Sequence, residues 1–377
     1  MAKGPPPSSE RIDSAALTKP ILMARPLPIP SQQAPGPIKN DLGVERRHAL
    51  TPPPTFIFRV AFPPDFPQTT PMAQIPQTRL TLKSWSLLLL LALIWGGSFT
   101  ANHAALAQLP VVTIVAFRVT IAAAALWAYI ALTGLPVPNA WRFRRDAVIM
   151  GLTNNIIPFS LIVWGQTHIA SGLAGILNAS TALFSVLVAA AVFPDEALGL
   201  RRLTGVLLGL AGVAVVIGPD ALTHFDPTST GQLAILGAGL SYALSGAYGR
   251  RAFRGVRPEV CAAAMLTASA LIMVPATLAL NGLPPAPDTK TLTAILYLAL
   301  IASAFAYRLF YTVLQAAGAG NIGLVTLLIA PVAVLLGATF FHEALPPTAF
   351  AGMALLTLGM VVIDGRPLAW LTARFVA

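Results

Sequence analysis

Long apolar runs follow one another from residue 85 to residue 364, separated by short breaks rich in proline, glycine and charge. A run of about 20 apolar residues is long enough to cross the hydrocarbon core of a bilayer. Because the bilayer core offers no water to backbone groups, each run is predicted to be a helix. The chain is therefore expected to be an all-α membrane protein with ten transmembrane helices. Their approximate ranges are 85–105, 110–132, 147–167, 171–193, 203–219, 231–249, 259–280, 291–313, 321–341 and 348–364.

The amino-acid composition argues against a soluble fold. Charged residues make up 10% of the chain and hydrophobic residues 56%, whereas ordinary soluble proteins are about 25% charged. The net charge of +10 is compatible with binding to nucleic acid. However, the positive charges form short clusters without the interleaved aromatic residues of a nucleic-acid channel. The expected partners are the lipid bilayer and a small-molecule substrate, with no nucleic acid. The single cysteine, Cys261, excludes an internal disulfide, and no cofactor or metal is expected.

Residues 1–78 differ from the rest of the chain. They hold 17 of the 33 prolines, together with eight Lys/Arg and five Asp/Glu residues, and show no helical periodicity. Such a segment buries too little apolar surface to offset its ordering entropy, so we expect a disordered proline-rich tail. It lacks the pattern of a secretory signal. We expect the tail to be dispensable, and Met72 is a plausible alternative start.

The positive charges between the apolar runs predict the orientation of the chain, since Lys and Arg collect on the cytoplasmic side. With ten spans, 13 of them fall on one side, and Lys290 alone falls on the other. Both termini are thus expected in the cytoplasm. The 13 residues are Arg79, Lys83, Arg142, Arg144, Arg145, Arg201, Arg202, Arg250, Arg251, Arg254, Arg257, Arg366 and Arg374.

The two halves of the apolar region resemble each other. At an offset of 147 residues, segment 193–218 matches segment 340–365, including a glutamate pair and several glycine pairs. We expect a first repeat at 79–219 and a second at 231–377, each with five helices. An odd number of helices inverts the second repeat in the membrane. Inverted repeats recur in secondary transporters that work by alternating access, so transport is the leading class of function.

Two arginines, Arg118 and Arg308, interrupt the apolar runs. Charges inside a bilayer are costly and often mark function. Arg118 lies about a third of the way into the second run, and Arg308 lies toward the middle of the eighth. Both are candidates to attract an anionic or carboxylate-bearing substrate group. The alternative is that each pairs with helix-end carbonyls or reaches the membrane surface.

The third run carries the densest uncharged polarity. Pro158 cannot donate to the carbonyl of Asn154, and Asn154, Asn155 and Gln166 add carboxamides, which together suit a neutral or zwitterionic ligand. The alternative is that these amides join neighbouring helices by hydrogen bonds. Asn178 is a further candidate with the same two readings, and Trp95 is either a cavity wall or an aromatic residue for packing or anchoring at the membrane surface. The eighth helix adds the candidates Tyr307, Tyr311 and Gln315 on one side.

Two glutamates, Glu196 and Glu343, stand at the expected starts of the fifth and tenth helices. A carboxylate there favours the positive end of the helix dipole, so each is expected to be a helix cap or a gating residue. The glycines at 205, 209 and 212 permit close helix packing.

These motifs together resemble the drug/metabolite transporter superfamily, specifically its EamA-like branch. The likeness rests on WGGSF near Trp95, AFRVT around Arg118, the polar third helix with WGQTH, and the acidic starts of the fifth and tenth helices. It covers residues 85–365. The resemblance implies ten helices and export or exchange of small metabolites without an ATP-binding part.

This chain departs from the family pattern at two positions. His103 stands where many relatives have lysine, and Ala182 stands where a proline is usual in the fourth helix, whereas the ninth keeps Pro331. We therefore expect the fourth helix to be straighter than the ninth.

We accordingly expect a secondary transporter that exports or exchanges amino-acid-like, zwitterionic or drug-like metabolites. A channel or lipid translocase on the same fold stays open. An intramembrane enzyme is disfavoured, because no HExxH, GxSxG or paired intramembrane carboxylates occur. The sequence does not distinguish a monomer from a homodimer, nor proton coupling from exchange.

Overall fold

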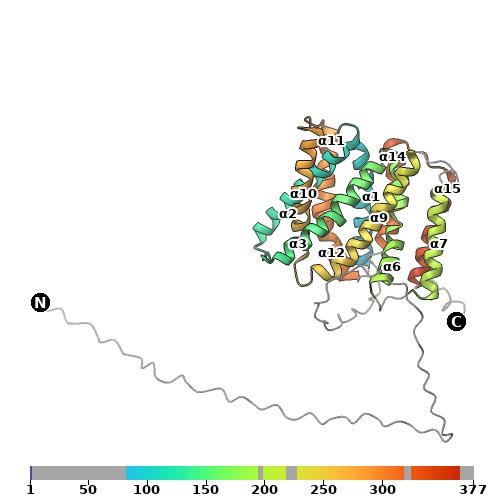
Figure 1. Cartoon of the computed structure of the whole chain (residues 1–377), viewed down its shortest axis with the longest axis horizontal. Coiled ribbons are helices and arrows are strands. Elements are labelled where there is room, and N and C mark those ends of the chain that lie inside the picture. Colours follow the sequence, from blue (N-terminus) through green and yellow to red (C-terminus); the bar gives the residue numbers. More distant parts are fainter. Residues whose placement is uncertain (2–81, 194–197, 218–226, 318–323, 366–377) are drawn as a thin grey trace, which may run out of the picture. The chain divides into compact units, whose positions relative to one another are not determined.

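The computed structural model describes Met1 and residues 82–193, 198–217, 227–317 and 324–365, and these ranges contain helices and no strand (Figure 1). The expected disordered tail lies outside the described residues. The helices are α1 (Leu82–Leu106), α2 (Val111–Thr133), α3 (Trp141–Gly151), the π-helix η1 (Leu152–Ile156), α4 (Ile157–Gly165), α5 (Ser171–Asn178), α6 (Thr181–Val192), α7 (Leu200–Ile217), α9 (Pro227–Ala252), α10 (Pro258–Asn281), α11 (Thr289–Leu296), the π-helix η3 (Tyr297–Phe305), α12 (Ala306–Ala317), α14 (Leu324–Phe341) and α15 (Pro347–Asp364).

Six helical stretches of the described chain are long and apolar enough to cross a membrane, as expected for an all-helical membrane protein. Two shorter apolar helices, Leu328–Phe341 and Pro347–Ile363, accompany them. The predicted spans at 203–219 and 231–249 correspond to α7 and α9, and the count of ten stays a prediction. The six stretches are Leu82–Leu106, Val111–Thr133, Trp141–Gly165, Ser171–Val192, Pro258–Asn281 and Thr289–Phe310.

Two of the spans contain π-helical segments. In the third, η1 lies between α3 and α4, and the Ile157 amide donates to the carbonyl of Leu152, five residues earlier. Pro158, which has no amide hydrogen, follows directly. In the eighth span, η3 joins α11 to α12. Wide turns of this kind are rare and often mark functional sites.

The expectation that the fourth helix is straighter than the ninth is wrong. Between α5 and α6, the amides of Ala179, Ser180 and Ala182 donate to carbonyls only three residues earlier, so the α-helix is interrupted. By contrast, α14 continues through Pro331 without interruption.

Two pairs of matching helices pack against each other: α2 with α10, and α7 with α15. The bounds of α7 and α15 differ by 147 residues at both ends (347 minus 200 and 364 minus 217), which is the sequence offset. A Cβ atom at Gly205 would lie 2.6 Å from the Gly359 carbonyl oxygen, and one at Gly212 would lie 2.8 Å from that of Gly352. Glycine is therefore required where these two helices cross.

The described loops form two groups. At one end, called the basic end here, Phe143 and Phe253 lie with ring centroids 5.8 Å apart, beside the arginines at 144 and 254. At the other end, called the α11 end, the Asp288 amide donates to Gln108 Oε1 at 3.0 Å. The Asp288 carboxylate caps α11, and its hydrogen bond from the Thr291 amide holds the pKa of that carboxyl below its ordinary value.

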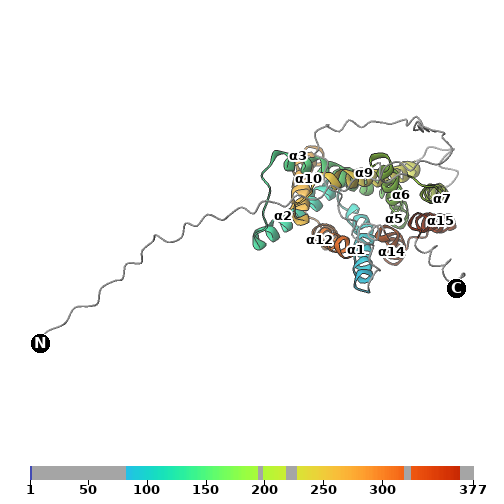
Figure 2. The same ribbon diagram turned by 90° about the horizontal axis from the view of Figure 1, so that it is seen from below.

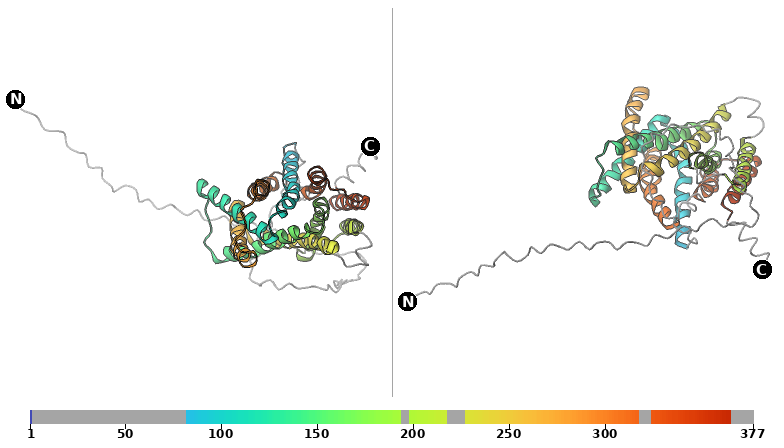
Figure 3. Two further views of the ribbon diagram at one scale, coloured as in Figure 1. Left: turned by 90° about the horizontal axis from the view of Figure 1, so that it is seen from above. Right: turned by 60° about the horizontal axis from the view of Figure 1, so that its bottom comes forward.

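Two apolar cores fill the described helices. One centres on α1, α5 and α14, and the other on α2 and α10. Tyr242 and Tyr297 pack against both. Viewed from below, α1 lies between α12 and α14 (Figure 2), and the view from above agrees (Figure 3, left). The candidate site lies where the two cores meet.

Candidate functional site

Arg118 is a buried cation at the boundary of the two cores. Its side chain extends from the eighth residue of α2, and the residue is only 6% exposed. Its Nε donates to the Ser303 hydroxyl in η3 at 2.9 Å, and its guanidinium carbon lies 3.7 Å from the ring centroid of Phe159 in α4. Tyr242 and Tyr297 are close enough to interact with its charge. Arg118 thus joins three helices through one hydroxyl and one aromatic face.

No carboxylate of the described residues lies within ion-pair distance of Arg118. A guanidinium has five N–H donors, and Ser303 is its one hydrogen-bond acceptor among those residues. Removing a cation from water without a compensating anion is costly. The arrangement leaves donors and a positive charge for an anionic group.

The asparagines of η1 belong to a hydrogen-bonded chain beside this cation. The Asn154 amide donates to the Tyr307 hydroxyl at 2.9 Å, and that hydroxyl donates to Asn155 Oδ1 at 2.8 Å. Asn155 Nδ2 then donates to Ser269 at 3.2 Å, and Ser245 donates to Asn154 Oδ1 at 2.9 Å. Asn155 is fully buried, so its amide links α10 and α12. The π-helical turn thereby places two carboxamides against three neighbouring helices.

Gln166 and Trp95 are also bonded within the protein. Gln166 donates to the Phe99 carbonyl at 2.8 Å and accepts from Asn102 at 3.1 Å. It also lines a cavity of about 490 Å³ at the α11 end. Trp95 donates to the Ala302 carbonyl at 3.3 Å, which connects α1 with η3. Both residues join helices.

Buried oxygen atoms without a protein partner gather at the interruption between α5 and α6. They are Asn178 Oδ1, Ser180 Oγ and Thr181 Oγ1, and none has a hydrogen bond to the described residues. Buried polar groups almost always have a partner. Asn178 therefore keeps an acceptor that water or a ligand can satisfy.

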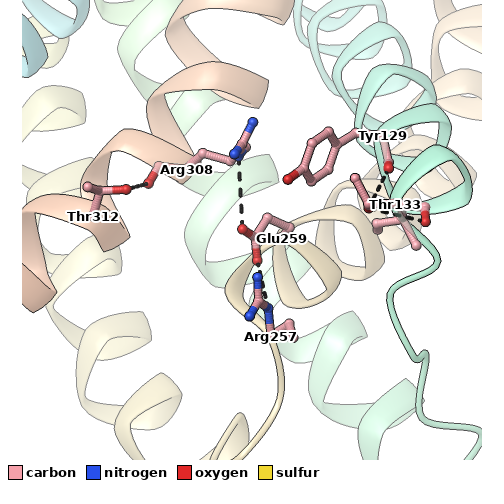
Figure 4. Close-up of polar contacts among 7 residues, drawn as sticks. Tyr129, Thr133, Arg257, Glu259, Arg308 and Thr312 are labelled. Carbon is pink, nitrogen blue, oxygen red and sulfur yellow. Dashed lines mark hydrogen bonds and ion pairs between the residues drawn. The ribbon is translucent and has the colours of Figure 1, made fainter.

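Arg308 has different surroundings from Arg118. Its side chain is 45% exposed, and its Nε lies 3.9 Å from Glu259 Oε1 (Figure 4). Glu259 also lies 3.6 Å from Arg257, and the Arg308 guanidinium carbon is 4.2 Å from the ring centroid of Tyr129. Tyr129 stands about three turns beyond Arg118 on α2. The structure therefore places Arg308 at the basic end, paired with a carboxylate.

Glu343 caps a helix other than the one that follows it. Its carboxylate accepts from the Ser171 amide at 2.9 Å, the Ser171 hydroxyl at 2.6 Å and the Gly172 amide at 2.9 Å. These groups are the first turn of α5, whereas α15 begins only at Pro347. The carboxylate joins the two repeats at the α11 end, where it meets the positive end of a helix dipole.

Three candidates cannot be placed. Glu196 lies outside the described residues, and the side chains of Tyr311 and Gln315 lie outside the described part of α12. Their roles stay predictions.

Two contacts of Arg118 were missed in the sequence, namely those with Ser303 and Phe159. A signal for Ser303 existed, because at the 149-residue offset that aligns Gln166 with Gln315, Ser303 matches Asn154. Each repeat thus places a polar residue inside a π-helical segment. Phe159 was placed by its helical spacing on the same face of the third run as Asn155 and Gln166, but its contact with Arg118 was not predicted.

Comparisons with known proteins agree on one family. The model of the EamA-like transporter family matches residues 82–218 and again 229–364. The "Uncharacterized transporter YvbV" of Bacillus subtilis is 24% identical, over 78% of this chain and 94% of the relative. The "Probable terminal-alkyne amino-acid exporter" of Streptantibioticus cattleyicolor is 26% identical, over 77% and 96%. The "Probable amino-acid metabolite efflux pump" of Escherichia coli is 24% identical, over 75% and 95%.

A solved crystal structure with 22% sequence identity has the same fold. The two superpose with a TM-score of 0.56, over 78% of this chain and 98% of the other.

Proposed function

This chain belongs to the EamA-like transporter family, and from that premise we propose that it exports small zwitterionic metabolites of the amino-acid type across the bacterial inner membrane. Arg118 binds the substrate carboxylate. The mechanism is alternating access about a site near the membrane midplane, without ATP.

The buried charge of Arg118 carries this proposal. The guanidinium is held between Ser303 and Phe159 and has no carboxylate partner among the described residues. An anion that entered the site would be met by a desolvated, pre-oriented donor set, in which charge-assisted hydrogen bonds are strong. A carboxylate matches the planar fork of the guanidinium.

Polar groups around the cation suit the rest of such a substrate. Tyr242, Tyr297 and Tyr307 contribute aromatic faces and hydroxyl groups near Arg118. Tyr faces attract an ammonium group, so they fit the amino end of a zwitterion. Two of the similar proteins are named as amino-acid or amino-acid-metabolite exporters, which supports this substrate class.

The proposed architecture is ten membrane-spanning helices in two inverted five-helix repeats, at 79–219 and 231–377. The recurrence of helix bounds at 147 residues in α7 and α15, and the packing of α2 on α10, support it. Both termini are in the cytoplasm, on the side of the basic end.

Ligand-dependent thermal stability of the purified protein tests the proposal. An apolar α-amino acid, its amide and the corresponding amine are compared at equal concentration. We expect the amino acid to raise the unfolding temperature, because ligand binding stabilises the folded state. The amide and the amine should have no effect, since each lacks the carboxylate. Stabilisation by the amine equal to that by the amino acid would overturn the role of Arg118.

Export itself is measured in proteoliposomes loaded with the labelled amino acid. The matched control is Arg308→Gln, which makes the same substitution at the other intramembrane arginine, at the basic end. We expect Arg118→Gln to lower export by about 10-fold to 100-fold and Arg308→Gln to retain it. Equal export by both variants would contradict the proposal.

A further inference from the structure

A groove at the α11 end of the protein is a second candidate site, and it shares Tyr297 with the surroundings of Arg118. Its floor is one face of α1, where Gly97, Thr100, Ala101 and Ala104 recur at helical spacing. Its walls come from α11 with η3 and from α14. Because these α1 residues have small side chains, they leave space between the walls, and the cavity measures about 770 Å³. That is within the range of small-molecule sites, about 300–1,000 Å³.

The groove opens toward the lipid. The same face of α1 continues into Leu93, which is 52% exposed, and Leu90, which is 41% exposed. On the α14 wall, Phe340 is 66% exposed. Since α1 is long and apolar enough to span a membrane, exposed leucines on it face acyl chains. The groove is therefore an indentation in the lipid-facing surface, and its apolar walls suit a hydrocarbon chain.

A cation stands at the loop end of this groove. Lys290 lies in the first turn of α11, with its Nζ 5.7 Å from the ring centroid of Phe341. The His103 ring lies 4.4 Å from the same phenyl ring. No described carboxylate pairs with Lys290, and the neighbouring Asp288 is engaged in capping α11. Thr100 Oγ1 and His103 Nδ1 are buried and have no partner in the described chain.

Lys290 is an exception to the charge distribution. Lys and Arg are depleted from non-cytoplasmic loops, and in this chain the other lysines and arginines between the predicted spans cluster at the basic end. A lone lysine at the α11 end is therefore not explained by topology. It stands where an anionic headgroup would lie above a chain held in the groove.

We propose that this groove is a binding site for one anionic phospholipid of the surrounding bilayer, with an acyl chain along α1 and the phosphate at Lys290. The proposed lipid differs from the transported substrate and lies at the groove rather than at the Arg118 guanidinium, although Tyr297 belongs to the surroundings of both.

Photo-crosslinking localises the lipid. The purified full-length protein is irradiated with phosphatidylglycerol that carries a diazirine in one acyl chain, and labelled peptides are identified by mass spectrometry. We expect labelling of residues 93–104 and 336–341 that excess phosphatidylglycerol prevents and excess phosphatidylcholine does not. Equal competition by the two lipids, or no labelling of these segments, would overturn the proposal.

Two variants separate the headgroup from the chain. Lys290→Gln should lower labelling of the groove several-fold, whereas the matched control Lys83→Gln, which changes a lysine in the first turn of α1, should not. Ala104→Phe fills the floor and should reduce labelling with either headgroup, while its unfolding temperature reports that it is folded. Undiminished groove labelling in folded Lys290→Gln contradicts the role of the lysine.

Discussion

Arg118 and Arg308 are similar in the sequence but opposite in their surroundings. Each is a single arginine in an apolar run. Arg118 is 6% exposed and meets only a hydroxyl and a phenyl ring. Arg308 has a side chain that is 45% exposed and lies 3.9 Å from the Glu259 carboxylate. The first has its charge uncompensated by the described residues, and the second has a partner and access to water.

This difference underlies the proposal that Arg118 binds substrate and that Arg308 has a structural role. A half-exposed ion pair contributes about 0–1 kcal/mol, because water screens it. A buried charge without an anionic partner lowers the stability of the fold. Such a charge is therefore expected to have a function. Substitution of Arg118 should consequently lower transport, whereas substitution of Arg308 should change mainly the stability, and only slightly.

The largest expected effect belongs to Arg118→Gln. Loss of a charge-assisted hydrogen bond to the substrate costs about 1.5–3 kcal/mol, so transport should fall by about 10-fold to 100-fold. The unfolding temperature should stay equal or rise, because no described carboxylate is left unpaired. Proteoliposome transport and thermal unfolding measure the two quantities. If the variant is much less stable but its folded fraction transports normally, Arg118 has a structural role, and the proposed difference from Arg308 is wrong.

The sequence could predict the family, through motifs such as WGGSF and AFRVT, and the helical class, through its apolar runs. It also singled out Arg118 as a charge within an apolar run, and the binding role of that residue stays a prediction. The sequence could not separate Arg118 from Arg308. That distinction depends on Glu259, which lies 49 residues before Arg308 (308 minus 259) and reaches it only through packing of α10 near α12. For the same reason Glu343 was expected to cap the helix that follows it, although its carboxylate bonds to α5.

Phe159→Leu tests the contact between the Arg118 guanidinium and the Phe159 ring. The guanidinium of Arg118 lies 3.7 Å from the ring centroid, and a desolvated cation–π contact is worth about 1–2 kcal/mol. Leucine keeps the apolar packing but removes the ring, so substrate affinity should fall about fivefold to 30-fold as the guanidinium loses its fixed orientation. Titration of the purified variant with the amino acid measures this affinity. Phe159→Tyr, which keeps a ring, should retain most of the affinity; if the leucine variant binds equally well, the ring does not orient the cation.

Ser303→Ala should have a smaller effect than Phe159→Leu. The hydroxyl accepts from Arg118 and donates to the Leu298 carbonyl within η3, so both stability and affinity should change by about 1 kcal/mol or less. Ser303→Thr keeps the hydroxyl and serves as the control. Affinity for the amino acid is measured by titration in both variants. A loss of affinity in Ser303→Ala as large as that in Arg118→Gln would contradict the minor orienting role of this hydroxyl.

The smallest effect is expected at Arg308, and a double-mutant cycle with Glu259 measures it. Because Glu259 keeps Arg257 at 3.6 Å when Arg308 is removed, Arg308→Gln does not leave the carboxylate alone. We expect Arg308→Gln and Glu259→Gln to lower the free energy of unfolding by at most about 1 kcal/mol each, with a coupling below about 1 kcal/mol. Export should stay within about threefold of the unmodified protein. A coupling of several kcal/mol would mean that the pair behaves as a buried one. An export defect as large as that of Arg118→Gln would give the two arginines the same role, and the basic end would then belong to the transport path.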